Sequence, residues 1–221
     1  MRYPGGKGKI FQHVINLLPP HNTYVETHLG GGAVLRHKKS SATSIAIDRD
    51  PQVITFWRKT FPHLATYVEG DAIEFLSSFP FCKDDVLYCD PPYLPSTRRR
   101  SKVYRYDYRE DDHERLLKAL RRLPCRILIS GYPSELYRAK LAGWNVYPFT
   151  AKAHDGLRLE NLWFNFVPPS RLHDSRFLGR DFREREMIRR RLGRLQRRIS
   201  NLSRQEQHVL SDWLANDLAT R

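Results

Sequence analysis

The chain has 221 residues, 40% of them hydrophobic, which is enough to bury the core of one catalytic domain and leave a modest extension. No apolar run approaches the length of a membrane span and the mean hydropathy is -0.60, so we expect a cytoplasmic protein that makes no membrane contact. The three cysteines have neither metal-ligand nor redox spacing, and we expect no metal site. A net charge of +14 and a pI of about 10.0 favour nucleic acid as the partner.

Short β-rich runs alternate with helical patterns along the first three-quarters of the chain, which predicts an α/β domain with a largely parallel sheet. The stretch Thr150–Glu160 between the last two strands is short and non-helical, which favours an antiparallel hairpin at one edge. The expected strands are Thr23–His28, Ser44–Asp48, Ala65–Glu69, Asp85–Cys89, Arg126–Ser130, Trp144–Phe149 and Asn161–Phe166. The expected helices are Lys7–Leu18, Gly32–Lys39, Pro51–Phe61, Ala72–Ser78, Asp111–Leu123 and Ser134–Leu141.

The sequence changes character at Pro168-Pro169, which we interpret as a linker between a catalytic domain (1–168) and a basic helical extension (169–221). Beyond it, apolar residues at alternating steps of four and three predict a helix with a narrow apolar seam. Ser203 and Glu206 form a possible capping box for a second helix, so we expect a helical hairpin. The seam of the first helix is Ile188, Leu192, Leu195, Ile199 and Leu202, and the apolar face of the second is Val209, Leu210, Trp213, Leu214 and Leu218.

The tetrapeptide Asp90-Pro91-Pro92-Tyr93 directly follows the apolar run Val86–Cys89. Ligands of open α/β sheets bind at the carboxyl ends of strands, and prolines keep their carbonyl acceptors while lacking N–H donors. Asp90 and the Pro91 carbonyl are suited to hold the hydrogens of an adenine amino group in line with a methyl sulfonium. Tyr93 is suited to stack on a base flipped out of its duplex. A plain turn is the structural alternative, and the position after a buried strand favours the catalytic interpretation.

Earlier strands also end in residues that suit a nucleotide-like ligand. Gly30–Gly32 permit a tight turn and a close approach of ligand to backbone. Asp48 ends the second strand, the usual place of a ribose-binding carboxylate, and Asp71 follows the third strand. One such acid is commonly only a helix cap, but repetition at successive strands favours a cofactor site. The candidate cofactor ligands in this region are Glu26, His28, Gly30, Gly32, Asp48, Asp71 and Ala72.

These motifs, in this order, resemble the Dam-like, D12-class family of DNA adenine-N6 methyltransferases. Arg2–Lys7 is similar to the family's N-terminal cofactor motif, the glycine turn to its first core motif, and Asp90–Tyr93 to its catalytic motif. Ile127–Ser130 and Glu160–Trp163 resemble its later strands, so the resemblance spans roughly the first three-quarters of the chain.

The resemblance implies S-adenosylmethionine as the cofactor, DNA as the partner, and a Rossmann-like seven-stranded mixed sheet whose last strand is antiparallel. The cofactor contacts that it implies are Tyr3, Lys7, Asp48, Asp71 and Asp90, with Pro4, Gly5 and Gly6 in the same N-terminal motif. Only Arg49–Thr66 lies where the family usually has a sizeable recognition domain, so we expect short or relaxed sequence specificity. Thr27-His28 replaces the family's Pro-Phe, so an imidazole takes the place of an aromatic cofactor contact, with simple packing as an equal alternative.

Two basic segments are candidates for nucleic-acid contact. The first, just after the catalytic motif, interleaves cations with aromatic rings, which suits phosphate contact and stacking; a solvated basic loop is the alternative. Its candidate residues are Arg98, Arg99, Arg100, Lys102, Tyr104 and Tyr106. The second is the helical extension, where Arg190, Arg194 and Arg197 lie away from the apolar seam. It either replaces the missing recognition domain or is the exposed face of a packing or dimerising helix pair.

We therefore predict an S-adenosylmethionine-dependent methyltransferase acting on adenine N6 of DNA, of the kind found in restriction-modification or phage systems. Methylation of adenine in RNA is the main alternative, because nothing in the sequence reads a 2′-hydroxyl. A non-catalytic nucleic-acid-binding module is a further alternative, disfavoured by Lys7, Asp48 and Asp90. Cytosine-N4 and protein-glutamine methylation are disfavoured because those groups more often have serine or asparagine at the position of Asp90. The oligomeric state is left open.

Overall fold

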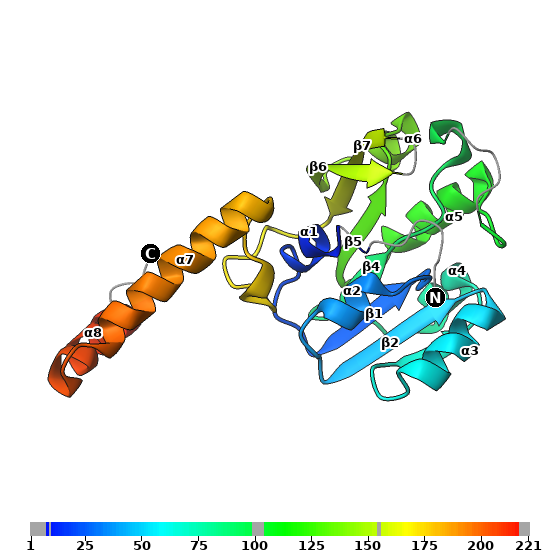
Figure 1. Ribbon diagram of the computed structural model, residues 1–221. Coiled ribbons are helices and arrows are strands. Elements are labelled where there is room, and N and C mark those ends of the chain that lie inside the picture. The colour runs from blue at the N-terminus through cyan, green and yellow to red at the C-terminus, as the bar shows by residue number, and fades with distance from the viewer. Residues whose placement is uncertain (1–7, 9, 99–103, 154–155, 217–221) are drawn as a thin grey trace. The chain divides into compact units, whose positions relative to one another are not determined.

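The structure is a computed structural model that describes residues 8, 10–98, 104–153 and 156–216 (Figure 1). The chain divides into two compact units, Met1–Ser175 and Arg176–Arg221. The contacts thus place the division somewhat later in the chain than the diproline does. The first unit is built on a seven-stranded sheet with strand order β3-β2-β1-β4-β5-β7-β6.

The described strands and helices follow the expected alternation closely. The strands are β1 (Thr23–Thr27), β2 (Thr43–Asp48), β3 (Thr66–Glu69), β4 (Val86–Cys89), β5 (Arg126–Gly131), β6 (Asn145–Ala153) and β7 (Gly156–Phe164). The helices of the first unit are α1 (Phe11–Ile15), α2 (Ala33–His37), α3 (Pro51–Thr60), α4 (Ala72–Ser78), α5 (Glu110–Leu120) and α6 (Glu135–Lys140), and Pro95–Thr97 (η1) and Ser175–Phe177 (η2) form short 3₁₀ turns.

The strand directions confirm the predicted mixed sheet. Strands β1 to β5 pair in parallel, whereas β7 is antiparallel to both β5 and β6. Because the chain passes from β3 at one edge back to the centre at β4, the sheet has its topological switch point between β1 and β4. Ligands of open α/β sheets bind outside the carboxyl ends of the strands at such a point.

The connection Thr150–Glu160 is the main departure from the expected elements. Most of it belongs to strands, because the β6–β7 ladder continues through Thr150↔Leu159 to Ala153↔Gly156. Charged and small residues interrupt the apolar alternation there. For this reason the predicted β6 ends too early and the predicted β7 begins too late. Strand β6 lies at the edge of the sheet, and an edge strand tolerates Pro148 because one side of its backbone needs no partner. The first helix is also shorter than predicted, since α1 covers only Phe11–Ile15.

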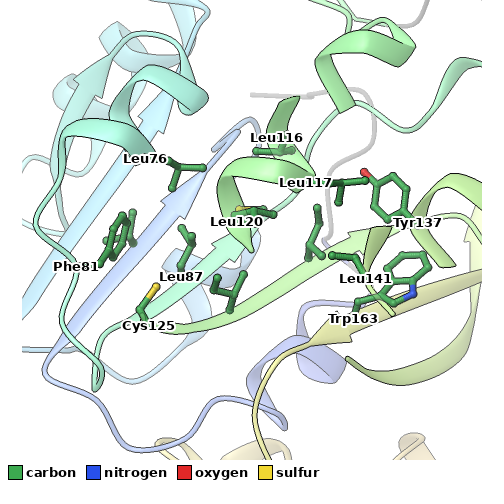
Figure 2. Packing of buried hydrophobic residues seen from close by; sticks show 14 of the residues in the cluster. Leu76, Phe81, Leu87, Leu116, Leu117, Leu120, Cys125, Tyr137, Leu141 and Trp163 are labelled. Carbon is green, nitrogen blue, oxygen red and sulfur yellow. The ribbon is translucent and has the colours of Figure 1, made fainter. Parts of the chain in front are cut away.

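One face of the sheet buries a large apolar cluster against α4, α5 and α6 (Figure 2). Leu116, Leu117 and Leu120 of α5 are fully buried there, at the spacing expected for one face of a helix. Strand residues that alternate with this cluster, such as Tyr88 and Leu128, are also fully buried, so both faces of the sheet are covered. Such double coverage is typical of parallel sheets and fixes the strand ends that carry polar residues.

The helices of the second unit are α7 (Phe182–Ser200) and α8 (Arg204–Asn216). Asp181 caps α7 by accepting a 2.9 Å hydrogen bond from the Glu184 amide. The capping box predicted for α8 is present, since the Ser203 hydroxyl accepts from the Glu206 amide and the Glu206 carboxylate accepts from the Ser203 amide. No described residue of α7 or α8 is buried. Within the described residues, no helix combines the length and apolar character of a membrane span.

Candidate active site

The motif Asp90–Tyr93 leaves the central strand β4 at the switch point of the sheet. Strand β4 is fully buried, and the motif continues it at its carboxyl end. Asp90 is half-buried and Pro91 is buried, so the carboxylate lies at the boundary between core and solvent. The backbone amide of Asp90 donates a 3.4 Å hydrogen bond to the carbonyl of Thr27 at the end of β1. The turn is therefore fastened to the neighbouring strand end.

The carboxylate of Asp90 is held by a hydroxyl from the next strand. Ser130, fully buried near the end of β5, donates a 2.7 Å hydrogen bond from Oγ to Asp90 Oδ1. The Tyr88 hydroxyl lies 3.2 Å from Ser130 Oγ. Because the Ser130 proton points to Asp90, the Tyr88 hydroxyl is the donor to Ser130. A chain of two hydroxyls thus orients the acid.

Tyr93 is more enclosed than expected for a residue that stacks on a base. Its side chain is 7% exposed, and its hydroxyl donates a 2.5 Å hydrogen bond to Oε2 of Glu160 on β7. The Tyr93 ring meets the ring of Tyr132 edge to face, with 4.5 Å between centroids. The Arg158 guanidinium lies over Tyr132 at 5.3 Å from the ring centroid. These contacts join β7, the end of β5 and the motif into one wall.

A cavity opens beside Asp90 at the carboxyl ends of the first four strands. It encloses about 470 Å³ of non-atom space, open solvent at its mouth included. Its lining includes four of the predicted ligands and tyrosines from the segment after the catalytic motif. The lining residues are His28, Ile47, Asp48, Arg49, Gly70, Ala72, Asp90, Pro92, Tyr104, Tyr106 and Tyr108.

The glycine turn after β1 is shaped by Asp48 and Trp57. The amide of Gly30 donates a 2.7 Å hydrogen bond to Asp48 Oδ2, and the Trp57 indole donates a 3.0 Å bond to the Gly30 carbonyl. Gly32 has φ +52°, and a Cβ there would lie 2.3 Å from Trp57 Cζ2. Glycine is therefore required at Gly32 by the packing of α3 as well as by the backbone. Asp48 both lines the cavity and braces this turn.

Two predicted cofactor ligands, Asp71 and Glu26, have other contacts. Asp71 is the N-cap of α4, where Oδ1 accepts from the Ile73 amide at 2.8 Å, and it is absent from the cavity lining. Glu26 is 3% exposed, and its Oε2 accepts a 2.7 Å bond from the Tyr24 hydroxyl. Burial raises the pKa of Glu26 to about 8. Both acids lie at strand ends as predicted. The Asp71 carboxylate caps a helix, and the Glu26 carboxylate is hydrogen-bonded inside the fold.

His28 lines the cavity in a left-handed backbone conformation, with φ +60°. Such a conformation is costly for a residue other than glycine and is concentrated at functional sites. Nε2 of His28 lies 2.9 Å from the Tyr108 hydroxyl, and Nδ1 lies 3.1 Å from the Thr27 hydroxyl. Desolvation lowers the pKa of His28 to about 3, so the imidazole is neutral at physiological pH. A neutral ring beside the cavity does not repel a cationic ligand.

The segment after the catalytic motif divides between cavity and interior. Tyr104 and Tyr106 line the cavity, although the sequence suggested nucleic-acid contact for both. The Arg98 side chain is 6% exposed and forms a 2.8 Å ion pair with Asp107, so it is enclosed in the fold. Of the other predicted residues, Tyr3, Pro4, Gly5, Gly6, Lys7, Arg99, Arg100 and Lys102 lie outside the described residues.

Several site residues were not singled out by sequence reasoning. Ser130 was placed only as a strand residue, although its position at the end of β5, next to β4, was a usable signal. Tyr108 continues the spacing of Tyr104 and Tyr106 by a further two residues, which was a second signal. No local pattern points to the long-range contacts of Glu160 or Arg158, because they depend on how β7 pairs with β5.

Part of the chain matches a known protein family. Residues 79–138, which include the Asp90–Tyr93 motif, match the model of the D12 class N6 adenine-specific DNA methyltransferase family. No curated protein matches the sequence.

Three of the solved structures that the chain matches have low sequence identity to it. TrmK of M. capricolum, in complex with S-adenosyl-homocysteine, is 9% identical, with 91% of this chain and 90% of that chain covered and a TM-score of 0.48. TrmN from Thermus thermophilus is 12% identical, with 71% and 47% covered and a TM-score of 0.49. A precorrin 8W decarboxylase of Methanobacterium thermoautotrophicum is 16% identical, with 75% and 94% covered and a TM-score of 0.48. The family match, on a seven-stranded α/β sheet, indicates a methyltransferase whose cofactor is S-adenosylmethionine.

Proposed function

We propose that the protein methylates N6 of adenine in DNA, with short or relaxed sequence specificity. The observation that carries this proposal is the placement of Asp90. Its carboxylate is fixed by Ser130 at the end of β4 and lines the same cavity as Asp48 and His28. The first unit is then the catalytic domain, and the second is a basic helical extension.

The residues of the cavity fit S-adenosylmethionine. When bound, this cofactor supplies an electrophilic methyl group on a positively charged sulfur. Asp48 and Asp90 place carboxylates on the lining, and the only described base there with a permanent charge is Arg49. His28 is neutral, and the rings of Tyr104, Tyr106 and Tyr108 offer faces that attract cations and stack on adenine.

A side chain and a backbone carbonyl of the motif meet the main chemical requirement of the reaction. The lone pair of an adenine amino group is delocalised into the ring, so the nitrogen is a poor nucleophile. Acceptors at Asp90 and the Pro91 carbonyl hold the two amine hydrogens and favour a tetrahedral nitrogen. Ser130 keeps the carboxylate in one orientation, so little reorganisation is needed as charge develops on the amine. Glu160 similarly fixes Tyr93 beside the place of the base.

Charge supports a nucleic-acid substrate. The chain carries a net charge of +14, and Arg190, Arg194 and Arg197 on α7 are all exposed. Guanidinium groups bind phosphates through paired hydrogen bonds. We therefore assign α7 a role in holding the DNA backbone. Because only α3 and a loop separate β2 from β3, the catalytic unit has little chain of its own for this task.

Labelled methyl transfer with several polymers tests the proposal. Purified protein is incubated with S-adenosylmethionine and single- or double-stranded DNA or RNA, and the nucleosides are identified by mass spectrometry. We expect N6-methyladenine in DNA. Asp90→Asn should lower kcat by about 10²–10³-fold and leave DNA affinity nearly unchanged. Asp111→Asn, at an exposed position of α5, is the matched control. Methyladenine confined to RNA, or full activity of Asp90→Asn, contradicts the proposal.

A further inference from the structure

The segment of residues 104–108, here called the tyrosine strap, lies along the cavity between the catalytic motif and α5. Tyr104, Tyr106 and Tyr108 line the cavity, while Arg105 reaches Asp50 at the start of α3. The strap therefore borders the cavity through its tyrosines and contacts the start of α3 through Arg105. Resting on the proposed function, we propose that the tyrosine strap is the closing wall of the cofactor site and that the Arg105–Asp50 pair is its latch.

One attachment of the strap is buried. Tyr108 is 5% exposed, and its hydroxyl lies 2.9 Å from Nε2 of His28. The Tyr108 ring meets the rings of His28 and His113 edge to face, at 5.1 Å and 5.6 Å between centroids. Removing this end from its neighbours would expose a large aromatic side chain and break a partly buried hydrogen bond. The Tyr108 end is the fixed side of the strap.

The other attachment is accessible to water. Nη1 of Arg105 lies 3.0 Å from Oδ1 of Asp50; the Arg105 side chain is 55% exposed, whereas that of Asp50 is 4% exposed. Tyr106, next to Arg105, is 40% exposed. An exposed guanidinium can leave a carboxylate at small cost, because water solvates it again. The Arg105 end is thus the side that can open without unfolding its surroundings.

The latch acts on the part of the site that holds the cofactor. Oδ1 of Asp50 also accepts from the Gln52 amide at 2.9 Å as the N-cap of α3, and the Asp50 amide donates to Asp48 Oδ1 at 2.8 Å. Asp50 is therefore a rigid anchor beside the carboxylate that lines the cavity. With S-adenosylmethionine bound, the tyrosine rings that line the cavity would offer it cation–π attraction and stacking, which would slow its departure while the strap is held on this anchor.

Binding kinetics of S-adenosylhomocysteine, the unreactive product, test the strap without any methyl transfer. Arg105→Ala should release it about three to ten times faster than the wild type, because a half-exposed ion pair with a buried carboxylate is lost. Asp50→Asn should do the same while keeping the helix cap, since asparagine caps as well as aspartate. The double variant should be no faster than either single one, because both act through one contact. Arg115→Ala, which removes an exposed ion pair on α5, is the matched control.

Hydrogen exchange gives a second measurement. S-adenosylhomocysteine should slow amide exchange in residues 104–108 of the wild type and slow it less in Arg105→Ala. Wild-type kinetics in both single variants, additive effects in the double variant, or unchanged exchange of the strap would overturn the latch while leaving the proposed function standing. Failure of the wild type to bind S-adenosylhomocysteine would overturn both.

Discussion

The hydroxyl of Ser130 donates a 2.7 Å hydrogen bond to Oδ1 of Asp90, across two neighbouring parallel strands. The register of the sheet sets this contact. Cys89 of β4 lies opposite Ile129 of β5, and Asp90 and Ser130 are the residues that follow them. The acid is thereby oriented by backbone pairing deep in the core.

Ser130→Ala should lower kcat by about tenfold or more, because a hydrogen bond to a charged group contributes about 1.5–3 kcal/mol. The affinity for S-adenosylhomocysteine should change little, so the loss falls on the chemical step. Ser130→Thr retains the hydroxyl and should recover part of the rate. Ser77→Ala, on the exposed face of α4, is the control for removal of a hydroxyl. An unchanged kcat in Ser130→Ala would show that Asp90 needs no such support.

The bond between Tyr93 and Glu160 makes a separate prediction. Both groups are at least nine-tenths buried, and the hydroxyl–carboxylate distance is 2.5 Å. Tyr93→Phe and Glu160→Gln should each raise KM for the nucleic acid several-fold, because the ring loses its fixed orientation beside the base. Steady-state kinetics with varied polymer concentration measures the effect.

A double-variant cycle separates positioning from general destabilisation. If Glu160 acts through the Tyr93 hydroxyl, Glu160→Gln should add little in a Tyr93→Phe background. Thermal unfolding of each variant provides the stability control. Fully additive changes in KM would mean that Glu160 acts elsewhere in the site.

Three desolvated histidines make the stability of the protein sensitive to acid. Desolvation lowers the pKa of His21 and His28 to about 3 and that of His113 to about 4. The unfolded chain takes up these protons near pH 6.5, so the stabilisation is complete above that pH and is lost as the pH falls. Burial of Glu26 acts oppositely, since its pKa is raised to about 8 and its stabilisation is lost as the pH rises from 4.5 to 8.

Together, these three histidines and Glu26 take up about two protons on unfolding near pH 5. The four groups should therefore make the free energy of unfolding fall by about 3 kcal/mol per unit decrease in pH there. Urea unfolding at several pH values measures this slope. His28→Asn, which tolerates the left-handed backbone, should lessen the slope by about one proton. A slope equal to that of the wild type would show that His28 is protonated in the folded protein.

The parallel core could be predicted because each strand is a short, continuous apolar run with turn residues after it. Strand β4 and its Asp90–Tyr93 motif are the best case, since burial, direction and chemistry are all local in the sequence. The hairpin β6–β7 could not be placed well, because its outer half owes its structure to backbone pairing and shows no apolar alternation.

Site residues divide in the same way. Asp48 and Asp90 were predicted from their places at strand ends and His28 from the family resemblance, and all three line one cavity. Asp71 has the same kind of place but caps α4, and a pattern of strand ends cannot distinguish a ligand from a cap. Tyr104 and Tyr106 of the tyrosine strap were assigned to nucleic acid because basic residues alternate with aromatic rings in that segment. Its direction is set by the contacts Arg105–Asp50 and Tyr108–His28, which join residues far apart in the chain.

The exposed arginines of α7 make a prediction about salt. Each phosphate that a cation neutralises releases counterions, so the logarithm of the binding constant falls with the logarithm of salt concentration by about 0.9 per contact. Replacing Arg190, Arg194 and Arg197 together with glutamine should reduce that slope by about 2 to 3 and weaken DNA binding. Fluorescence anisotropy from low to moderate salt measures both quantities.

A second triple variant controls for net charge alone. Lys59, Arg115 and Arg138 are exposed on α3, α5 and α6, and their replacement by glutamine removes the same charge from the catalytic unit. If α7 contacts the backbone directly, the control should retain most of the wild-type slope, because long-range attraction is screened beyond about 10 Å at 0.1 M salt. Equal slopes in the two triple variants would mean that α7 acts only through net charge. A wild-type slope in the α7 variant would remove these three arginines from the DNA interface and leave their helix a packing or dimerising role.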